Sequence, residues 1–218
     1  MAPSTTRQRI IRAARQMVKR GSDLPIDDVA RRAGVSVQTI YSNFGSKRGL
    51  VLAAIDDMQR EVGLYGEFDA VFASPHGEAA LRRMLQATFM LWDRGWPLVS
   101  FTLRARRIDR ELGAQLAEVD TMRRTHLWVI YRRLDAEGRL RTPGAAELAA
   151  DVAFALSTPT VYEELVHGRG WPVDHATTTI ADIVIQATVD PATTPITDPP
   201  PDWGALGLGA AGSRSTTA

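Results

Sequence analysis

Hydrophobic residues recur at a helical period along most of the chain. In residues 7–20, apolar side chains lie at i, i+4 and i+7, which predicts a first helix with one buried stripe. Between Ser46 and Tyr65 the apolar spacing alternates between four and three residues, which predicts a long helix. The pattern as a whole predicts an all-α protein, with further helices over residues 78–94, 98–107, 109–137, 145–167 and 173–189.

Prolines and glycines are expected to interrupt these helices. Trp96-Pro97 is expected to break a helix, because proline removes a backbone donor. Pro159 is expected to kink or divide the helix over residues 145–167 for the same reason. The segment from Gly66 to Gly77 is interpreted as a linker or loop anchored by two phenylalanines.

The most informative stretch begins at Pro25, which suits a first helical position and is followed by acidic residues in the first turn. Gly34 suits the left-handed residue that ends a short helix. Ser36 is a natural N-cap for a second short helix, Val37–Phe44. Two short helices joined by three or four residues with a glycine form a helix-turn-helix, whose second helix enters the DNA major groove.

The start of the following helix carries an unusual pair of charges. Ser46 can cap this helix, yet Lys47 and Arg48 follow at once. Two cations at the positive end of a helix dipole are unfavourable by several tenths of a kcal/mol. A DNA phosphate bound by the free amides and both side chains would explain the pair. The alternative is a lysine and an arginine that are simply solvated.

The string AGVSVQTIYSNFGSKRGL resembles the signature of the TetR (tetracycline-repressor-like) family of transcriptional regulators. The resemblance is dense over about residues 7–62 and includes the Thr-Ile-Tyr core and the Phe-Gly-Ser-Lys that opens the next helix. Three residues depart from the common pattern. Asn43 stands where His is frequent, Arg48 where Glu is frequent, and Pro25 where a Thr or Ser cap is frequent.

The resemblance implies an N-terminal helix-turn-helix head over residues 1–47, joined by a long fourth helix to a helical ligand-binding and dimerisation domain over residues 48–190. Its motif places two residues at positions that face bases and the others at positions that meet phosphates. We therefore expect the DNA-binding residues to be Val37 and Gln38 on the bases, and Thr39, Tyr41, Asn43, Lys47 and Arg48 on the phosphates.

A second segment, VYEELVHGRGW, resembles the C-terminal domain of one TetR subgroup, where it joins the last two helices. It lengthens the resemblance to most of residues 7–190. We also expect a homodimer, because one head alone buries too little surface for tight specific binding. The last two helices, residues 145–167 and 173–189, are expected to form its interface because their apolar stripes are broad and their charges few.

Charge is distributed unevenly along the chain. Residues 1–60 contain 11 Lys and Arg against 5 Asp and Glu, whereas the remaining residues contain 15 against 20. A basic head on an acidic body is typical of a DNA-binding module carried by a domain with another task. The arginines of the first helix (Arg7, Arg9, Arg12 and Arg15) are interpreted as phosphate contacts or, alternatively, as a solvated basic face.

Composition excludes several classes of site. The chain is 44% hydrophobic, 23% charged and free of cysteine, so disulfides and thiolate metal sites are excluded. No run of 18 apolar residues occurs and the N-terminus lacks an apolar signal core, so we expect a cytoplasmic protein without a membrane partner.

Eight aromatic residues in the body fall on four predicted helices. A packed core is one interpretation, because large aromatics dominate helical cores. A ligand cavity is the other, because Tyr and Trp suit an apolar site with polar tips, and TetR-like proteins bind small effectors in this region. The predicted effector-binding residues are Phe89, Trp92, Trp96, Phe101, Trp128, Tyr131, Phe154 and Tyr162.

Other chemistry finds little support. Residues 207–212 spell G-x-G-x-x-G, but they lie in a Pro-, Gly- and Thr-rich tail, residues 191–218, that we expect to be disordered. His167 follows Glu163 by four residues, a spacing that suits a metal pair but equally a solvated helix end. We therefore expect no enzyme, no cofactor and no metal.

These observations predict a regulator that binds palindromic double-stranded DNA, most often as a repressor, and is released by a small apolar effector. Two alternatives remain open. The chain could be a helical enzyme or carrier that retains a DNA-binding head, or a constitutive DNA-binding dimer without an effector.

Overall fold

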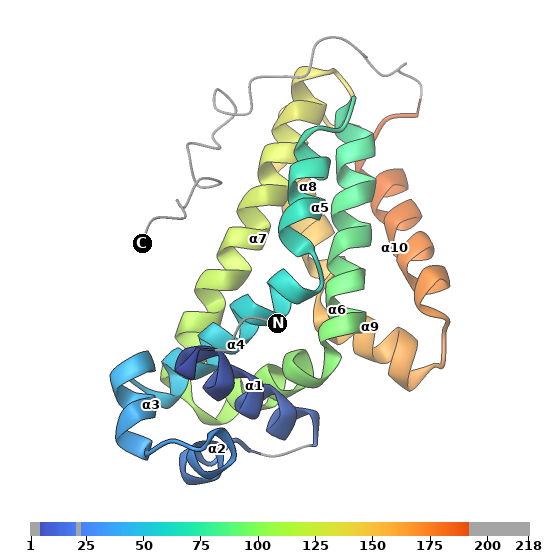
Figure 1. Cartoon of the computed structure of the whole chain (residues 1–218). Helices are drawn as coiled ribbons and strands as arrows, with labels where there is room; N and C mark the ends of the chain where they lie inside the picture. The colour runs from blue at the N-terminus through green and yellow to red at the C-terminus, as the bar shows by residue number, and fades with distance from the viewer. Residues whose placement is uncertain (1–4, 21–22, 192–218) are drawn as a thin grey trace. The chain divides into compact units, whose positions relative to one another are not determined.

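The computed structural model describes residues 5–20 and 23–191, and the predicted disordered tail with its glycine motif lies outside the described residues apart from residue 191. Within the described ranges the chain is built from helices, and the prediction of an all-α protein is confirmed (Figure 1). A lone bridge between Leu140 and Val189 is the sole β-type pairing recorded there.

The helices form two compact units that do not follow chain order. The first unit comprises residues up to Tyr65 together with Leu91–Ala117, and the second comprises Gly66–Met90 and the chain from Glu118 onward. Helices α6 (Gly77–Ile108) and α7 (Arg110–Ala136) contribute to both units. The predicted functional boundary between residues 47 and 48 stays a prediction.

The first unit contains α1 (Thr6–Lys19), α2 (Ile26–Ala33), α3 (Val37–Phe44) and α4 (Lys47–Glu61). Helix α1 packs on α2 and α4, and α3 packs on α2 and α4 (Figure 1). Ile10, Val29 and Leu50, from three of these helices, are fully buried. The apolar stripes that the sequence predicts therefore form the core of this unit.

The second unit contains most of α5 (Leu64–Phe72), α8 (Ala146–Leu156), α9 (Pro159–Tyr162), a π-helical turn η1 (Glu163–Gly168) and α10 (Val173–Thr188). Helices α8 and α10 lie side by side. Arg133, on α7, is almost fully buried, and its guanidinium donates to the carbonyl oxygens of Ser74 and Pro75 just beyond the end of α5. The buried charge is thus paired with backbone carbonyls of the connection between α5 and α6.

Two expectations about helix boundaries are wrong. The long helix expected from Ser46 to Tyr65 ends at Glu61, because Gly63 adopts a left-handed conformation with φ of 78°. The segment expected to be a loop from Gly66 to Gly77 instead contributes most of helix α5. Its fully buried Val71, and the packing of two phenylalanines on His126, explain why it is helical.

Pro97 does not break its helix as expected, because α6 runs continuously through it. A proline inside a helix removes one hydrogen bond and costs about 3 kcal/mol. Burial of Leu98, Val99 and Phe101 immediately after it offsets this loss.

Two other prolines begin helices. Pro25 is the N-cap of α2 rather than its first helical residue, with extended φ and ψ of −64° and 128°. Pro159 occupies the first turn of the short helix α9, and the prediction that it divides the helix over residues 145–167 is confirmed.

Candidate functional site

Helix α3 has the structure that the helix-turn-helix pattern predicts. Gly34 ends α2 in the left-handed region, with φ of 65°. Ser36 caps α3, its hydroxyl accepting a hydrogen bond from the Thr39 amide at 3.1 Å. Ile40 is fully buried and fastens the helix to the unit, so the opposite face of α3 is turned outward.

The outward residues of α3 differ in their burial and in whether their side chains have hydrogen-bond partners within the protein. Val37 is half-buried, and the Thr39 hydroxyl lies 2.8 Å from that of Ser36. Gln38 and Tyr41 are exposed, and in the described part of the chain no residue bonds to either side chain. These two side chains are therefore available to an external partner.

Asn43 is engaged at both its side chain and its backbone. Its amide nitrogen donates to the Thr39 carbonyl at 2.8 Å, and its own carbonyl accepts from Arg7 at 2.7 Å. The Arg7 guanidinium also lies 4.5 Å from the centre of the Phe44 ring. Because an amide has two N–H donors, Asn43 retains one for the predicted phosphate contact, whereas Arg7 ties α1 to the end of α3.

The junction of α3 and α4 depends on a close backbone approach. A Cβ atom at Gly49 would lie 2.0 Å from the Phe44 carbonyl oxygen, so only glycine fits there. Ser46 caps α4 by accepting from the Gly49 amide at 3.0 Å. The start of α4 is therefore held directly against the end of α3.

Lys47 and Arg48, the two cations at this helix start, both have partners within the first unit. Lys47 donates to the backbone carbonyl of Asp23 at 2.9 Å, which leaves its other two donors available. Arg48 Nε donates to both carboxylate oxygens of Asp109, at 3.0 and 3.1 Å, and Nη1 lies 2.6 Å from Glu111. A phosphate contact by Arg48 would have to compete with these two carboxylates.

Asp109 has a second role, because it caps α7 by accepting from the amides of Glu111 and Leu112 at 3.1 and 3.0 Å. The hydrogen bond from the Leu112 amide, and then the Arg48 guanidinium, hold the pKa of the Asp109 carboxyl below its usual value. The sequence contained no signal for this partner of Arg48, since the two residues are 61 positions apart.

The basic face of α1 also has internal partners. Arg15 pairs with Asp57, at 2.5 Å, and with Glu61, both on α4. Arg12 lines a groove of about 1110 Å³ between α1, the end of α4 and part of α6, and has no ion pair within the described residues. The predicted binding of these arginines to DNA phosphates stays a prediction.

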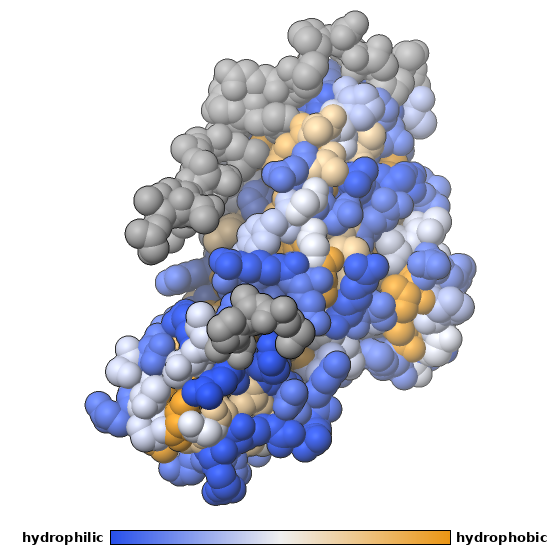
Figure 2. All heavy atoms as spheres, viewed as in Figure 1, coloured by the Kyte–Doolittle hydropathy of each residue, from blue (hydrophilic) through white to orange (hydrophobic). Residues whose placement is uncertain are grey.

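In Figure 2 the visible surface of the first unit is mainly hydrophilic, with a small hydrophobic area.

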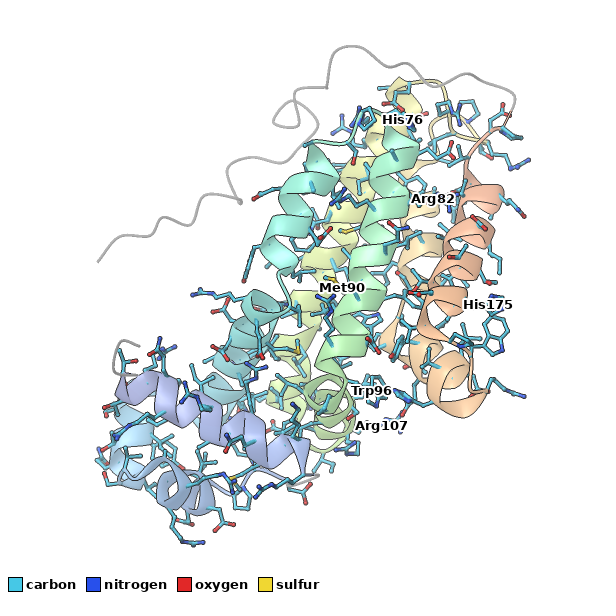
Figure 3. The ribbon with its side chains drawn as sticks, turned by 45° about the vertical axis from the view of Figure 1, so that its right-hand side comes forward. His76, Arg82, Met90, Trp96, Arg107 and His175 are labelled. Atoms are coloured by element: carbon cyan, nitrogen blue, oxygen red, sulfur yellow. The ribbon has the colours of Figure 1, made fainter. Side chains whose placement is uncertain are left out.

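The eight aromatic residues predicted to bind an effector are divided between the two units. Trp92, Trp96 and Phe101 belong to the first unit, where Figure 3 shows Trp96 on α6. Trp92 and Phe101 are buried, and Phe101 lines a second cavity near the start of α4. The remaining members, in the second unit, are Phe89, Trp128, Tyr131, Phe154 and Tyr162.

In the second unit, three of these aromatics are core residues. Phe89, Tyr131 and Tyr162 are at most 1% exposed. The rings of Phe89 and Tyr162 meet edge to face at 5.9 Å, and the Tyr131 hydroxyl lies 2.9 Å from that of Thr188. These contacts are ordinary core packing, so an effector cavity among them stays a prediction.

The other two aromatics lie beneath arginines. The Arg123 guanidinium is 4.0 Å from the centre of the Phe154 ring and donates to the Ser157 hydroxyl at 2.9 Å. Burial lowers the pKa of Arg123 to about 10, so it remains charged at neutral pH. Arg132 lies 5.1 Å above the Trp128 ring. Both positions combine an apolar surface with a cation.

Metal and membrane sites find no support in the described ranges. Across residues 5–20 and 23–191, no three His, Asp or Glu side chains are placed to hold a metal ion. His126 packs between two phenylalanines, and burial lowers its pKa. None of the helices described there has both the length and the apolar composition needed to cross a bilayer.

Comparison with known proteins finds a family match for part of the first unit. Residues 10–54 match the family model for bacterial regulatory proteins of the tetR family, a segment that contains all of α2 and α3. No curated protein sequence matches the chain.

Solved structures of regulators share the fold over most of the chain. The triclosan complex of SmeT, the repressor of a multidrug efflux pump in Stenotrophomonas maltophilia, is 19% identical, with a TM-score of 0.69 over 91% of this chain and 99% of that one. FadR from Bacillus subtilis, solved with stearoyl-CoA, is 17% identical, with a TM-score of 0.68 over 81% and 96%. A protein described as a transcriptional regulator from Saccharomonospora viridis, solved with choline, is 20% identical, with a TM-score of 0.66 over 84% and 97%.

Proposed function

We propose that the chain, whose residues 10–54 match the tetR family of bacterial regulatory proteins and whose fold is shared with solved transcriptional regulators, binds an operator to control transcription. The observation that carries the proposal is helix α3, whose exposed Gln38 and Tyr41 have no partner in the described part of the chain. Gln38 is assigned to a base edge, and Lys47 at the start of α4 to a phosphate.

The proposed operator is a palindrome bound by a homodimer. One head buries too little surface for tight specific binding, whereas a two-fold dimer would present two copies of α3 about 34–36 Å apart. Helices α8 and α10 are the proposed interface, and each has an exposed large apolar residue, Leu148 and Ile183. We propose that the protein is located in the cytoplasm, because its proposed operator DNA is there.

Control by a small apolar effector is the second part of the proposal. A ligand can shift DNA binding only by binding one arrangement of the protein better than another. The triclosan, stearoyl-CoA and choline complexes of proteins with this fold support effector control without identifying this chain's ligand. TetR-family regulators are generally not enzymes, and the proposed function involves binding alone.

A gel-shift titration with the DNA upstream of the chain's own gene tests the proposal. We expect selective binding to a palindrome, at least about 10³-fold tighter than to random DNA at physiological salt. Release by one compound from a panel of apolar metabolites would support effector control, and selective binding that no compound alters would favour a constitutive dimer. Equal affinity for upstream and random DNA would overturn the proposal.

A further inference from the structure

A small cavity lies at the start of α4, entirely within the first unit, and has a volume of about 260 Å³. Its walls are the first turns of α4, the last two turns of α6, the start of α7 and Asp23. This volume lies just below the range of roughly 300–1,000 Å³ that is typical of pockets for drug-sized ligands. The cavity suits a small ligand rather than a lipid or a nucleotide.

The cavity has an apolar floor and an apolar rim. Val51, Phe101 and Leu112 line it and are 1%, 5% and 4% exposed. Ile108, on the last turn of α6, also lines it but is 88% exposed. An apolar molecule seated here would cover both the buried floor and this exposed side chain, which is a favourable burial of apolar surface.

One cationic side chain at the cavity has no ion pair or hydrogen bond within the described residues. Lys47 is bonded to the Asp23 carbonyl, and Arg48 to Asp109 and Glu111. Arg104, on α6, is exposed and has neither an ion pair nor a side-chain hydrogen bond among residues 5–20 and 23–191. Asp23 and Asp109 also line the cavity, so its three cationic lining residues exceed its acidic ones by one charge.

We propose that this cavity, which is lined by Phe101 but by none of the other seven predicted effector-binding aromatics, binds a small monocarboxylate with a compact apolar body. The carboxylate accepts hydrogen bonds from the Arg104 guanidinium, and the apolar body rests on Phe101, Val51 and Ile108. Charge-assisted bonds to a guanidinium are stronger than neutral ones, which gives the site its preference for an acid over a neutral molecule of the same shape.

Binding here would act on the first turn of α4. The ligand would join that turn to the ends of α6 and α7, alongside the ion pair between Arg48 and Asp109. The site itself does not depend on the proposed function, whereas its effect on DNA affinity rests on it.

The test uses the full chain with benzoate as the probe and benzamide as its neutral isostere, by calorimetry and thermal unfolding at 150 mM salt. We expect benzoate to bind and raise the melting temperature, and benzamide to bind about tenfold more weakly or not at all. Arg104→Gln should remove this preference. The matched control is Arg107→Gln. Arg107 is exposed, like Arg104, and lies on the last turn of α6 (Figure 3), but it does not line the cavity, so this variant should keep the preference.

A second variant tests the cavity rather than its charge. Ala105→Leu places a larger side chain in the wall and should abolish benzoate binding, while its melting temperature without ligand verifies that it is folded. Absence of benzoate binding at millimolar concentration, or equal loss in Arg104→Gln and Arg107→Gln, would overturn the site. Intact operator binding in the same samples would show that only this inference, and not the proposed function, had failed.

Discussion

Gln38 is the residue to which the proposed base readout can be traced. It is exposed on α3, and a glutamine can bond an adenine through both edge atoms, which is worth roughly 1–3 kcal/mol of discrimination. Gln38→Ala should therefore flatten the sequence preference at one base pair in each half-site. The measurement is a binding-site selection with wild type and variant at one salt concentration.

Lys47→Ala tests a phosphate contact, in contrast to the base contact that Gln38→Ala tests. A phosphate contact carries no sequence information, so this variant should weaken binding to all sequences alike and lower the salt slope by about one. A sequence preference that is unchanged in Gln38→Ala would show that another residue reads the bases.

At the scale of helices, the ion pair between Arg48 and Asp109 joins the start of α4 to the start of α7. Both side chains are 34% exposed, so solvent screening makes the contribution of such a pair small. We expect Arg48→Gln and Asp109→Asn each to change operator affinity by less than about fivefold. Their effects should not add in the double variant, because they break the same interaction.

The salt dependence separates this pairing from a phosphate contact. If Arg48 pairs only with Asp109 and Glu111, the slope of affinity against salt is the same in Arg48→Gln as in wild type. A slope lower by about one in Arg48→Gln alone would instead assign Arg48 to DNA, as the family resemblance implied. Asparagine at position 109 still caps a helix well, so the start of α7 is preserved in the comparison.

At the scale of the whole molecule, the proposed dimer makes DNA binding depend on α8 and α10. Leu148, on α8, and Ile183, on α10, are 66% and 46% exposed. Replacing both by Glu would place charges in the proposed apolar interface, so the variant should sediment as a monomer at micromolar concentration. Its affinity for the palindrome should fall towards that for a half-site.

Met122→Glu is the matched control, because Met122 is 60% exposed on α7, outside the proposed interface. This variant should remain dimeric and bind the palindrome normally. A wild-type monomer that still binds the palindrome tightly would contradict the proposal, and so would a dimer that survives both Leu148→Glu and Ile183→Glu.

Much of the first unit could be predicted from sequence because its determinants are local. The bounds of α3, its Ser36 cap and the left-handed Gly34 each depend on residues within one turn. The same holds for Pro159 in the second unit, which begins α9 directly after the Thr158 N-cap. Features of this kind can be predicted from the sequence because they depend on neighbouring residues alone.

Tertiary packing decided the rest. The sequence by itself determined an all-α chain with a helix-turn-helix near its N-terminus, because helical period and caps act over a few residues. Only the folded structure showed that α6 continues through Pro97, that Arg48 faces Asp109, and that Phe101 and Arg104 border a cavity. Each of these depends on burial or charge pairing between segments distant in the chain, and the spacing of residues along one segment does not encode its neighbours.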